Sequence, residues 1–117
     1  MAHPIVGIWQ VELELEGQLT HVTHAYHPDG IMHLDAGEHG ASLLWEATGD
    51  RSFRFRGTRP VERDLYRFLG WQYADGEAEV SPDGAMFVGT ELTAGPRPDG
   101  ERVARRATLR GTRLAIE

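Results

Sequence analysis

The feature of this sequence that most constrains its fold is a strict alternation of apolar and polar side chains. Between residues 9 and 15 the odd positions are apolar, and the even positions carry glutamine or glutamate. Successive side chains of a β-strand point to opposite faces, whereas a helix would scatter these residues around its axis. Residues 53–56 repeat the pattern with two phenylalanines against two arginines. The sequence therefore predicts strands with one buried face.

Turn signals separate the alternating runs at regular intervals. The triplet Pro-Asp-Gly occurs at residues 28–30, 82–84 and 98–100. Proline presets its own φ, aspartate hydrogen-bonds the nearby backbone, and glycine accepts the positive φ of a tight turn. Each triplet stands between two strand-like runs and so predicts a hairpin. Gly49-Asp50 and Asp75-Gly76 are interpreted as further turns or bulges.

These signals predict about eight strands and no helix. The expected ranges are 5–15, 19–27, 31–36, 42–48, 51–59, 65–74, 77–81 together with 85–94, and 102–115. Asp75-Gly76 leaves two alternatives open, a break between strands or a bulge inside one long strand. Consecutive hairpins favour a meander, and a meander of eight strands closes into a barrel without exposed edges. We therefore expect residues 1–117 to form one all-β domain, an up-and-down antiparallel β-barrel.

Composition excludes several classes of function. Cysteine is absent, which removes disulfides, thiol nucleophiles and thiolate metal sites, and lysine is absent, which removes Schiff-base chemistry. The net charge of −6 argues against unspecific nucleic-acid binding. No apolar run approaches the roughly 20 residues of a membrane helix, and no secretory signal is visible near the start. We expect a cytoplasmic protein without nucleic-acid or membrane partners.

Several short motifs are arranged in an order that is characteristic of one family. They are Gly7-Ile8-Trp9, Tyr26-His27-Pro28-Asp29-Gly30, Trp45-Glu46-Ala47-Thr48-Gly49-Asp50-Arg51, Asp83-Gly84-Ala85-Met86-Phe87-Val88-Gly89 and Arg110-Gly111-Thr112-Arg113. This arrangement resembles the lipocalin and wider calycin family, and in particular small bacterial lipocalin-like domains. The resemblance implies a cup with an interior site, in which Arg113 packs over Trp9 and closes one end. The chain lacks the disulfide cysteines of secreted lipocalins and is shorter, so their extracellular transport role does not carry over.

The histidines are the first candidate functional residues. By analogy with the family, the aromatic residue two positions before the proline points inward, so His24 and Tyr26 line the barrel. They are either a hydrogen-bonded pair of the core, or they bind a ligand or act as general acid and base. His21 and His27 share the opposite face, so no set of three histidines forms on this strand. His27 and His33 can meet across the first Pro-Asp-Gly hairpin, but we expect no functional metal site.

Polar residues on otherwise apolar faces form a second group. Arg105 lies between Val103 and Ala107 on the apolar side of the last strand, and Glu91 and Asp35 are also candidates for the interior. A buried arginine needs a carboxylate or a ligand anion. Arg105 therefore pairs with Glu91 on the neighbouring strand, or it binds a ligand oxygen.

Aromatic residues form the third group. Those expected in the interior, as core or as pocket walls, are Trp45, Phe53, Phe55, Phe68 and Phe87. Trp71 and Tyr73 lie outside if Ala78 and Val80 point inward along an unbroken strand. A bulge at Asp75-Gly76 would reverse this and place both in the pocket.

Three hypotheses follow. The first is a barrel that binds a small, largely apolar molecule in its lumen. The second is a cofactor-independent cyclase or isomerase that uses His24, Tyr26 and Arg105 on a polyketide-like or terpene-like substrate in the same cavity. The third is an interaction protein in which outward-facing Trp71 and Tyr73 form a partner or homodimer surface. No cofactor is expected under any of them.

Overall fold

The computed structural model describes residues 2–36, 39–62, 68–96 and 102–115, with the backbone alone at 36, 39, 59–62, 68, 69, 102 and 115. Within these ranges the chain forms eight strands and no helix, which confirms the predicted all-β class. The strands are β1 (Gly7–Leu15), β2 (Gln18–Tyr26), β3 (Ile31–Ala36), β4 (His39–Ala47), β5 (Ser52–Glu62), β6 (Phe68–Val80), β7 (Met86–Pro96) and β8 (Arg102–Ala115). The described part of the chain contains no helix that is long and apolar enough to span a membrane.

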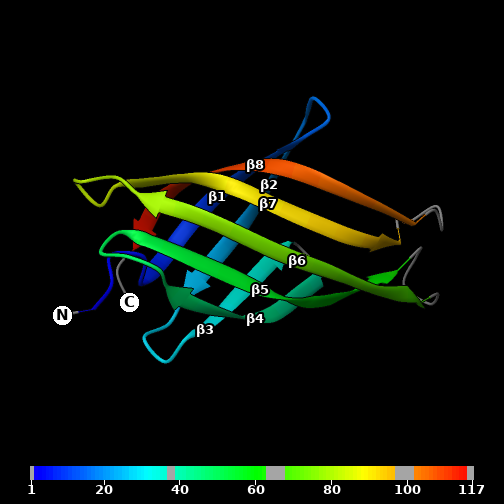
Figure 1. Ribbon diagram of the computed structural model, residues 1–117, viewed down its shortest axis with the longest axis horizontal. Helices are drawn as coiled ribbons and strands as arrows, with labels where there is room; N and C mark the ends of the chain where they lie inside the picture. The colour runs from blue at the N-terminus through cyan, green and yellow to red at the C-terminus, as the bar shows by residue number, and fades with distance from the viewer. Residues whose placement is uncertain (1, 37–38, 63–67, 97–101, 116–117) are drawn as a thin grey trace.

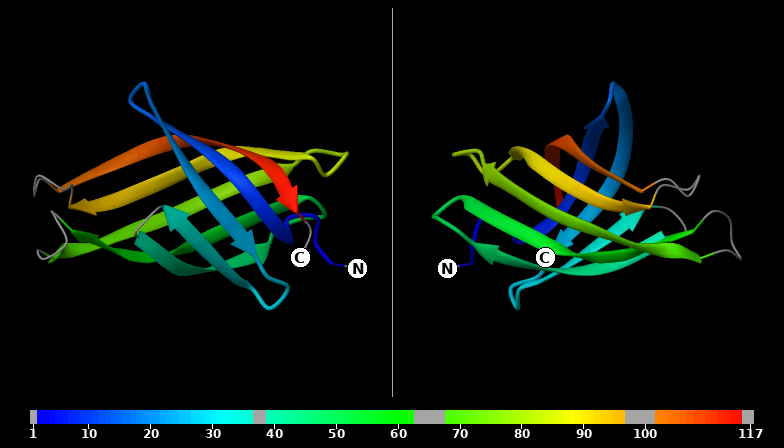
Figure 2. Two further views of the ribbon diagram at one scale, coloured as in Figure 1. Left: turned by 180° about the vertical axis from the view of Figure 1, so that it is seen from behind. Right: turned by 45° about the vertical axis from the view of Figure 1, so that its right-hand side comes forward.

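The strands form one closed up-and-down barrel. Each strand pairs antiparallel with the next, and β8 pairs with β1 to complete the ring (Figure 1). The two ends of the chain lie at the same end of the barrel, and the β1–β2 hairpin projects from the barrel wall (Figure 2). The predicted turns at 28–30 and 82–84 connect β2 to β3 and β6 to β7, and Gly49-Asp50 connects β4 to β5. The third triplet, at 98–100, lies outside the described residues.

The prediction of a turn or bulge at Asp75-Gly76 is wrong. β6 is one continuous strand, and its pairing with β5 passes through Arg56↔Asp75 and Phe55↔Gly76 without a shift. Gly76 has a different role, because its side of the strand faces the interior and a β-carbon there would overlap the Phe55 ring. The glycine therefore makes room for an aromatic side chain on the neighbouring strand and is not a turn residue.

A second glycine also makes room for a buried aromatic ring on the neighbouring strand. Gly111 of β8 pairs directly with Phe87 of β7, and a β-carbon at Gly111 would overlap that ring. Both phenylalanines are fully buried or nearly so. Each buried ring contributes about 1.5–3 kcal/mol by removal from water. The glycine opposite each ring has no side chain, so the ring can be buried without steric overlap.

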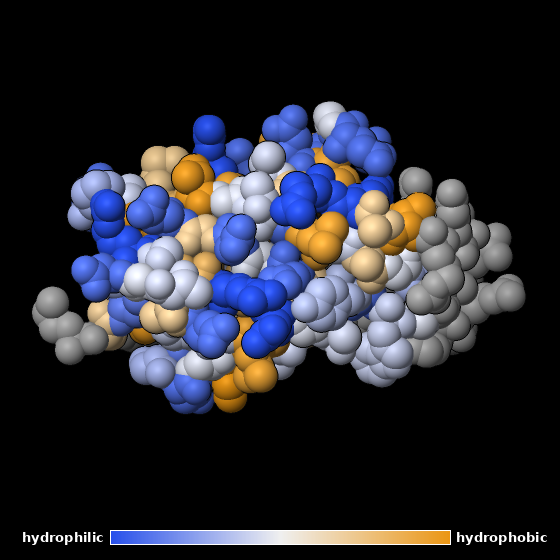
Figure 3. Space-filling view, in the orientation of Figure 1, coloured by the Kyte–Doolittle hydropathy of each residue, from blue (hydrophilic) through white to orange (hydrophobic). Residues whose placement is uncertain are grey.

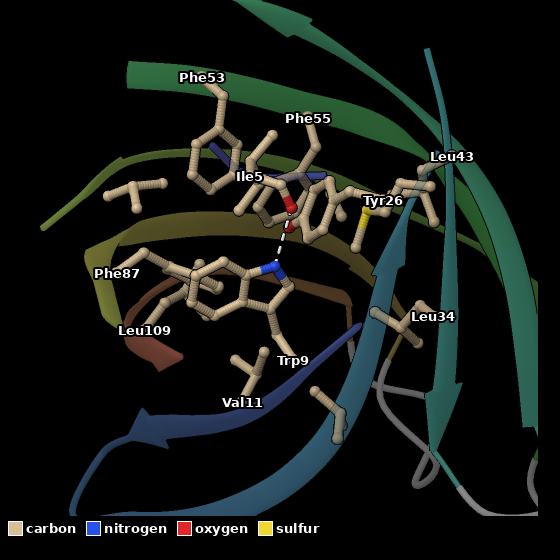
Figure 4. Close-up of a cluster of buried hydrophobic side chains, with 14 residues drawn as sticks. Ile5, Trp9, Val11, Tyr26, Leu34, Leu43, Phe53, Phe55, Phe87 and Leu109 are labelled. Atoms are coloured by element: carbon tan, nitrogen blue, oxygen red, sulfur yellow. Dashed lines mark hydrogen bonds between the residues drawn. The ribbon is translucent and has the colours of Figure 1, made fainter. Parts of the chain in front are cut away.

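The end of the barrel that holds the chain termini is closed by Trp9 and Arg113. The Trp9 indole is fully buried and donates a hydrogen bond of 2.8 Å from Nε1 to the Ile5 carbonyl (Figure 4). The Arg113 guanidinium carbon lies 4.3 Å from the centre of the indole ring, which confirms the expected packing. The same guanidinium donates to the carbonyls of Gly84 at 2.8 Å and Val6 at 3.0 Å, and also to that of Pro4. One side chain thus joins β8 to the N-terminal segment and the β6–β7 turn.

Replacing Arg113 by methionine should therefore destabilise the protein strongly. The change removes the donor for three backbone carbonyls and the cation over Trp9, and we expect the free energy of unfolding to fall by about 2–4 kcal/mol. Arg110→Met is the matched control because Arg110 is exposed on the outer face of the same strand. Urea unfolding followed by circular dichroism measures both. Equal effects of the two substitutions would contradict the closing role of Arg113.

Candidate functional site

The interior of the barrel near Trp9 is filled by aromatic rings in mutual contact. The Phe87 ring centre lies 5.0 Å from that of Trp9 and 5.4 Å from that of Phe53. Tyr26 lies 5.3 Å from Phe53, and Phe55 stacks on Phe53 at 6.5 Å. Phe53, Phe55 and Phe87 face the interior as predicted, and in this half they pack as core (Figure 4).

Trp45 lies at the edge of this aromatic core. Its side chain is half-buried, and its Nε1 donates a 2.8 Å hydrogen bond to the His27 carbonyl. Its ring centre is 6.2 Å from that of Tyr26 and 5.8 Å from that of His3. The side chain of Phe68, the remaining aromatic residue expected in the interior, lies outside the described part of the structure.

Trp71 and Tyr73 lie on the outside of the barrel and do not line the interior. They are 59% and 39% exposed, because β6 has no bulge at Asp75-Gly76 and its even-numbered residues from Ala74 to Val80 point inward. The Tyr73 hydroxyl donates to Asp75 at 3.4 Å. On the face shown in Figure 3, apolar residues are scattered among charged ones. A partner surface formed by these two aromatic residues stays a prediction.

Among the residues whose side chains the structure describes, three polar ones are buried inside the barrel: His24, Glu91 and Thr93. His24 is fully buried, and its Nδ1 lies 2.9 Å from the hydroxyl of Tyr26, within hydrogen-bond distance. Both side chains point inward from β2, as predicted. Burial, together with the negative charge of Glu91, raises the pKa of Tyr26 well above its ordinary value. The phenol is therefore a neutral group beside an imidazole and a carboxylate.

Arg105 lies nearer the other end of the barrel. Its side chain is 22% exposed, and its Nη1 lies 3.4 Å from Glu16 Oε2 at the β1–β2 turn. Its buried Nε makes no hydrogen bond to the described residues. The ion pair seen for Arg105 is therefore with Glu16, a turn residue, whereas the sequence suggested Glu91. Asp35, the other acidic candidate, is exposed on β3.

Two adjacent rows of cross-strand partners show how the interior changes along its length. The row nearer Trp9 contains Phe55, Gly76, Glu91 and Ala107. The next row contains Gly57, Ala74, Thr93 and Arg105. Thr93 was missed by the sequence analysis, although its spacing of two from Glu91 places it on the same face. Beyond Phe55, therefore, these four strands present small or polar side chains to the interior.

The wall of the barrel is interrupted beside this second row. The ladder between β4 and β5 runs from Ala47↔Phe53 to Leu44↔Arg56, and no further pair is formed between their described residues. The remaining part of β5 includes Pro60, which has no N–H to donate to a ladder. Gly57 and the half-buried Ala41 lie where the two strands stop pairing. The buried side chain of Leu43 on β4 packs over Gly57 at this point.

Histidine, aspartate and glutamate side chains do not gather in groups of three or more that could hold a metal ion among the described residues. His21 lies 3.8 Å from Glu12 on the outer surface, while His24 is inside the barrel. Comparison of the chain with protein-family models, with curated proteins and with solved structures finds no match. The functional assignment therefore depends on the geometry of the barrel.

The raised pKa of Tyr26 makes stability fall at alkaline pH. The native state keeps the phenolic proton where the unfolded chain, with a tyrosine pKa of about 10, loses it, so the free energy of unfolding falls above that pH. For this residue the loss should be about 1.4 kcal/mol between pH 8 and pH 11. Lysine, which would titrate in the same range, is absent.

Urea unfolding of the wild type and of Tyr26→Phe at both pH values tests this effect. The variant keeps the ring and lacks the ionisable hydroxyl, so its stability should change less over the interval. The same loss in both proteins would show that Tyr26 ionises as easily in the native state as in the unfolded chain.

Proposed function

We propose that this barrel binds a small, largely apolar molecule in the part of its interior beyond Phe55, as a lipocalin-like binding protein of the cytoplasm. The observation that carries the proposal is the contrast between the two parts of the interior. Near Trp9, aromatic rings fill the space. Beyond Phe55 the inward positions of β5 and β6 carry Gly57 and Ala74, and Ala107 lies in the row of Phe55 itself, next to this region. Small side chains there favour an open space at the barrel axis.

The buried polar groups support a binding site in the same place. His24, Glu91 and Thr93 are buried polar groups; His24 lies within hydrogen-bond distance of Tyr26, and the Thr93 hydroxyl donates to the Arg105 carbonyl at 3.4 Å. Small-molecule sites are typically apolar and contain a few such groups, which orient the ligand. Arg105 adds a partly buried guanidinium as the cross-strand partner of Thr93. The proposed path of entry is the end of the ladder between β4 and β5, where the side chain of Leu43 would have to move away from Gly57.

A fluorescent probe that is uncharged and apolar, N-phenyl-1-naphthylamine, tests the binding proposal. We expect the wild type to bind it with enhanced fluorescence, and Ala107→Phe to abolish binding while the fold is retained, because the new ring enters the open space. Ala104→Phe is the control, since Ala104 is exposed on the outer face of β8.

The stability of Ala107→Phe gives an independent readout. If the interior is open, the added ring costs little, whereas in a filled interior overpacking should destabilise by about 1–3 kcal/mol or more. Failure of the wild type to bind the probe, together with a strongly destabilised Ala107→Phe, would overturn the proposal.

The His24–Tyr26 pair favours a second candidate function, a cofactor-independent cyclase or isomerase acting in the same space. A neutral phenol with a raised pKa, 2.9 Å from an imidazole nitrogen, can donate a hydrogen bond or proton to a reacting group. Arg105 can stabilise developing negative charge on an oxygen. Such a reaction needs orientation of the substrate and acid–base groups, and these residues supply both.

Small molecules that copurify with the wild type and with His24→Gln distinguish the two functions. Cyclisation and isomerisation conserve mass, so the extracts must be compared by chromatographic retention as well as by native mass spectrometry. A binding protein should yield the same compound from both. An enzyme should yield the product from the wild type and an isomer of it, the unreacted substrate, from the variant.

A further inference from the structure

The β2–β3 hairpin carries a pair of histidines that the interior site does not use. His27 and His33 lie on the outer face, and their ring centres are 4.8 Å apart at an interplanar angle of 74°. Together with Pro28, Asp29 and Ile31 they line an open cleft of about 410 Å³. Because β2 alternates, His24 points into the barrel while His27 points away from it.

We propose that His27 and His33 form a two-histidine site for a divalent transition-metal ion of the zinc and copper class. An imidazole nitrogen binds Zn²⁺ at about 2.0–2.1 Å, so two ligating nitrogens lie within about 4 Å of each other. The ring centres are 4.8 Å apart, and His27 Nε2 is buried, so a change of side-chain rotamer has to turn a nitrogen of His27 toward the ion. Water fills the remaining coordination positions.

The surroundings of His33 orient it for this role. Its Nδ1 lies 3.0 Å from the hydroxyl of Ser42 on β4. A hydroxyl accepts as readily as it donates, so an Nδ1–H bonded to Ser42 leaves Nε2 with the lone pair that binds a metal. A hydrogen bond to the second ring nitrogen is the usual way in which proteins fix the tautomer and direction of a metal-binding histidine.

The hairpin keeps the two rings together. Its backbone is held by hydrogen bonds from His27 N to Ile31 O at 2.9 Å and from Gly30 N to His27 O at 3.2 Å. The Asp29 carboxylate accepts from Ile31 N at 3.0 Å, which tightens the turn and places a negative charge at the cleft. The net charge of the chain, −6, further favours a cation.

Titration of metal-free, tag-free protein with Zn²⁺ by calorimetry, and then with Cu²⁺, tests the site. We expect one ion per chain, with Cu²⁺ bound more tightly than Zn²⁺ as imidazole ligands require. His27→Ala and His33→Ala should each weaken binding by more than about tenfold, since loss of a second-sphere partner alone typically costs 10–100-fold. Electron paramagnetic resonance of the Cu²⁺ form should show coupling to two nitrogens in the wild type and to one in either variant.

Two other histidines on neighbouring strands serve as controls. His21→Ala, on the outer face of β2, and His39→Ala, at the start of β4, should bind both metals as the wild type does. Unchanged binding in both His27→Ala and His33→Ala would overturn the proposal, as would binding lost in a control variant or absent from the wild type. Circular dichroism of each variant confirms that the fold is intact.

Discussion

The contact between Trp9 and Arg113 is the constraint on which the rest of the barrel depends. An eight-stranded meander has to join its last strand to its first, and the pairing of β8 with β1 brings these two residues together as direct partners. The guanidinium then satisfies carbonyls of the N-terminal segment and of the β6–β7 turn. This end is therefore closed, and a ligand of the kind proposed above would have to enter at the other end or through the wall.

Closure of that end also determines where the large side chains can lie. The Phe87 ring packs on the buried indole, Phe53 packs on Phe87, and Tyr26 packs on Phe53. The glycines opposite Phe55 and Phe87 remove the overlap that a β-carbon would create. A large aromatic side chain on one strand is thus accommodated by a glycine on the neighbouring strand. The same arrangement recurs at Gly57, where a β-carbon would lie 2.8 Å from Leu43 Cγ on β4. Ala74, the ladder partner of Gly57 on β6, has no large side chain directly across from it on β5 or β7.

Much of this could be predicted from the sequence, because period-two alternation depends only on the chemistry of single strands. It places Phe53 and Phe55 inside and Arg54 and Arg56 outside, and it gives the number of strands. The errors arose where one residue type has two physical uses. Asp75-Gly76 has the composition of a turn, yet the glycine makes room for a ring on another strand, and that partner is known only once the register is known.

The partner of Arg105 was unpredictable for a related reason. The length of the β1–β2 hairpin and the tilt of the strands bring Glu16, a residue far away in sequence, to 3.4 Å from the guanidinium. The alternation of residues within one strand does not indicate which residue of a distant turn an arginine will contact. His24 and Tyr26 were accessible because their relation is local: residues two apart on a strand share a face.

The histidines on and next to β2 lie on both faces of the strand, so their surroundings differ. His24, a buried imidazole within hydrogen-bond distance of a phenol, is three positions along the chain from His27, which belongs to the pair of imidazoles at the adjacent turn. Alternation directs them to opposite sides of the wall, so a ligand inside and an ion outside would contact the same strand without touching each other. Any coupling between the two sites would have to pass through the backbone of β2. Residues 23–26 of that strand are paired with β1 on one side and β3 on the other.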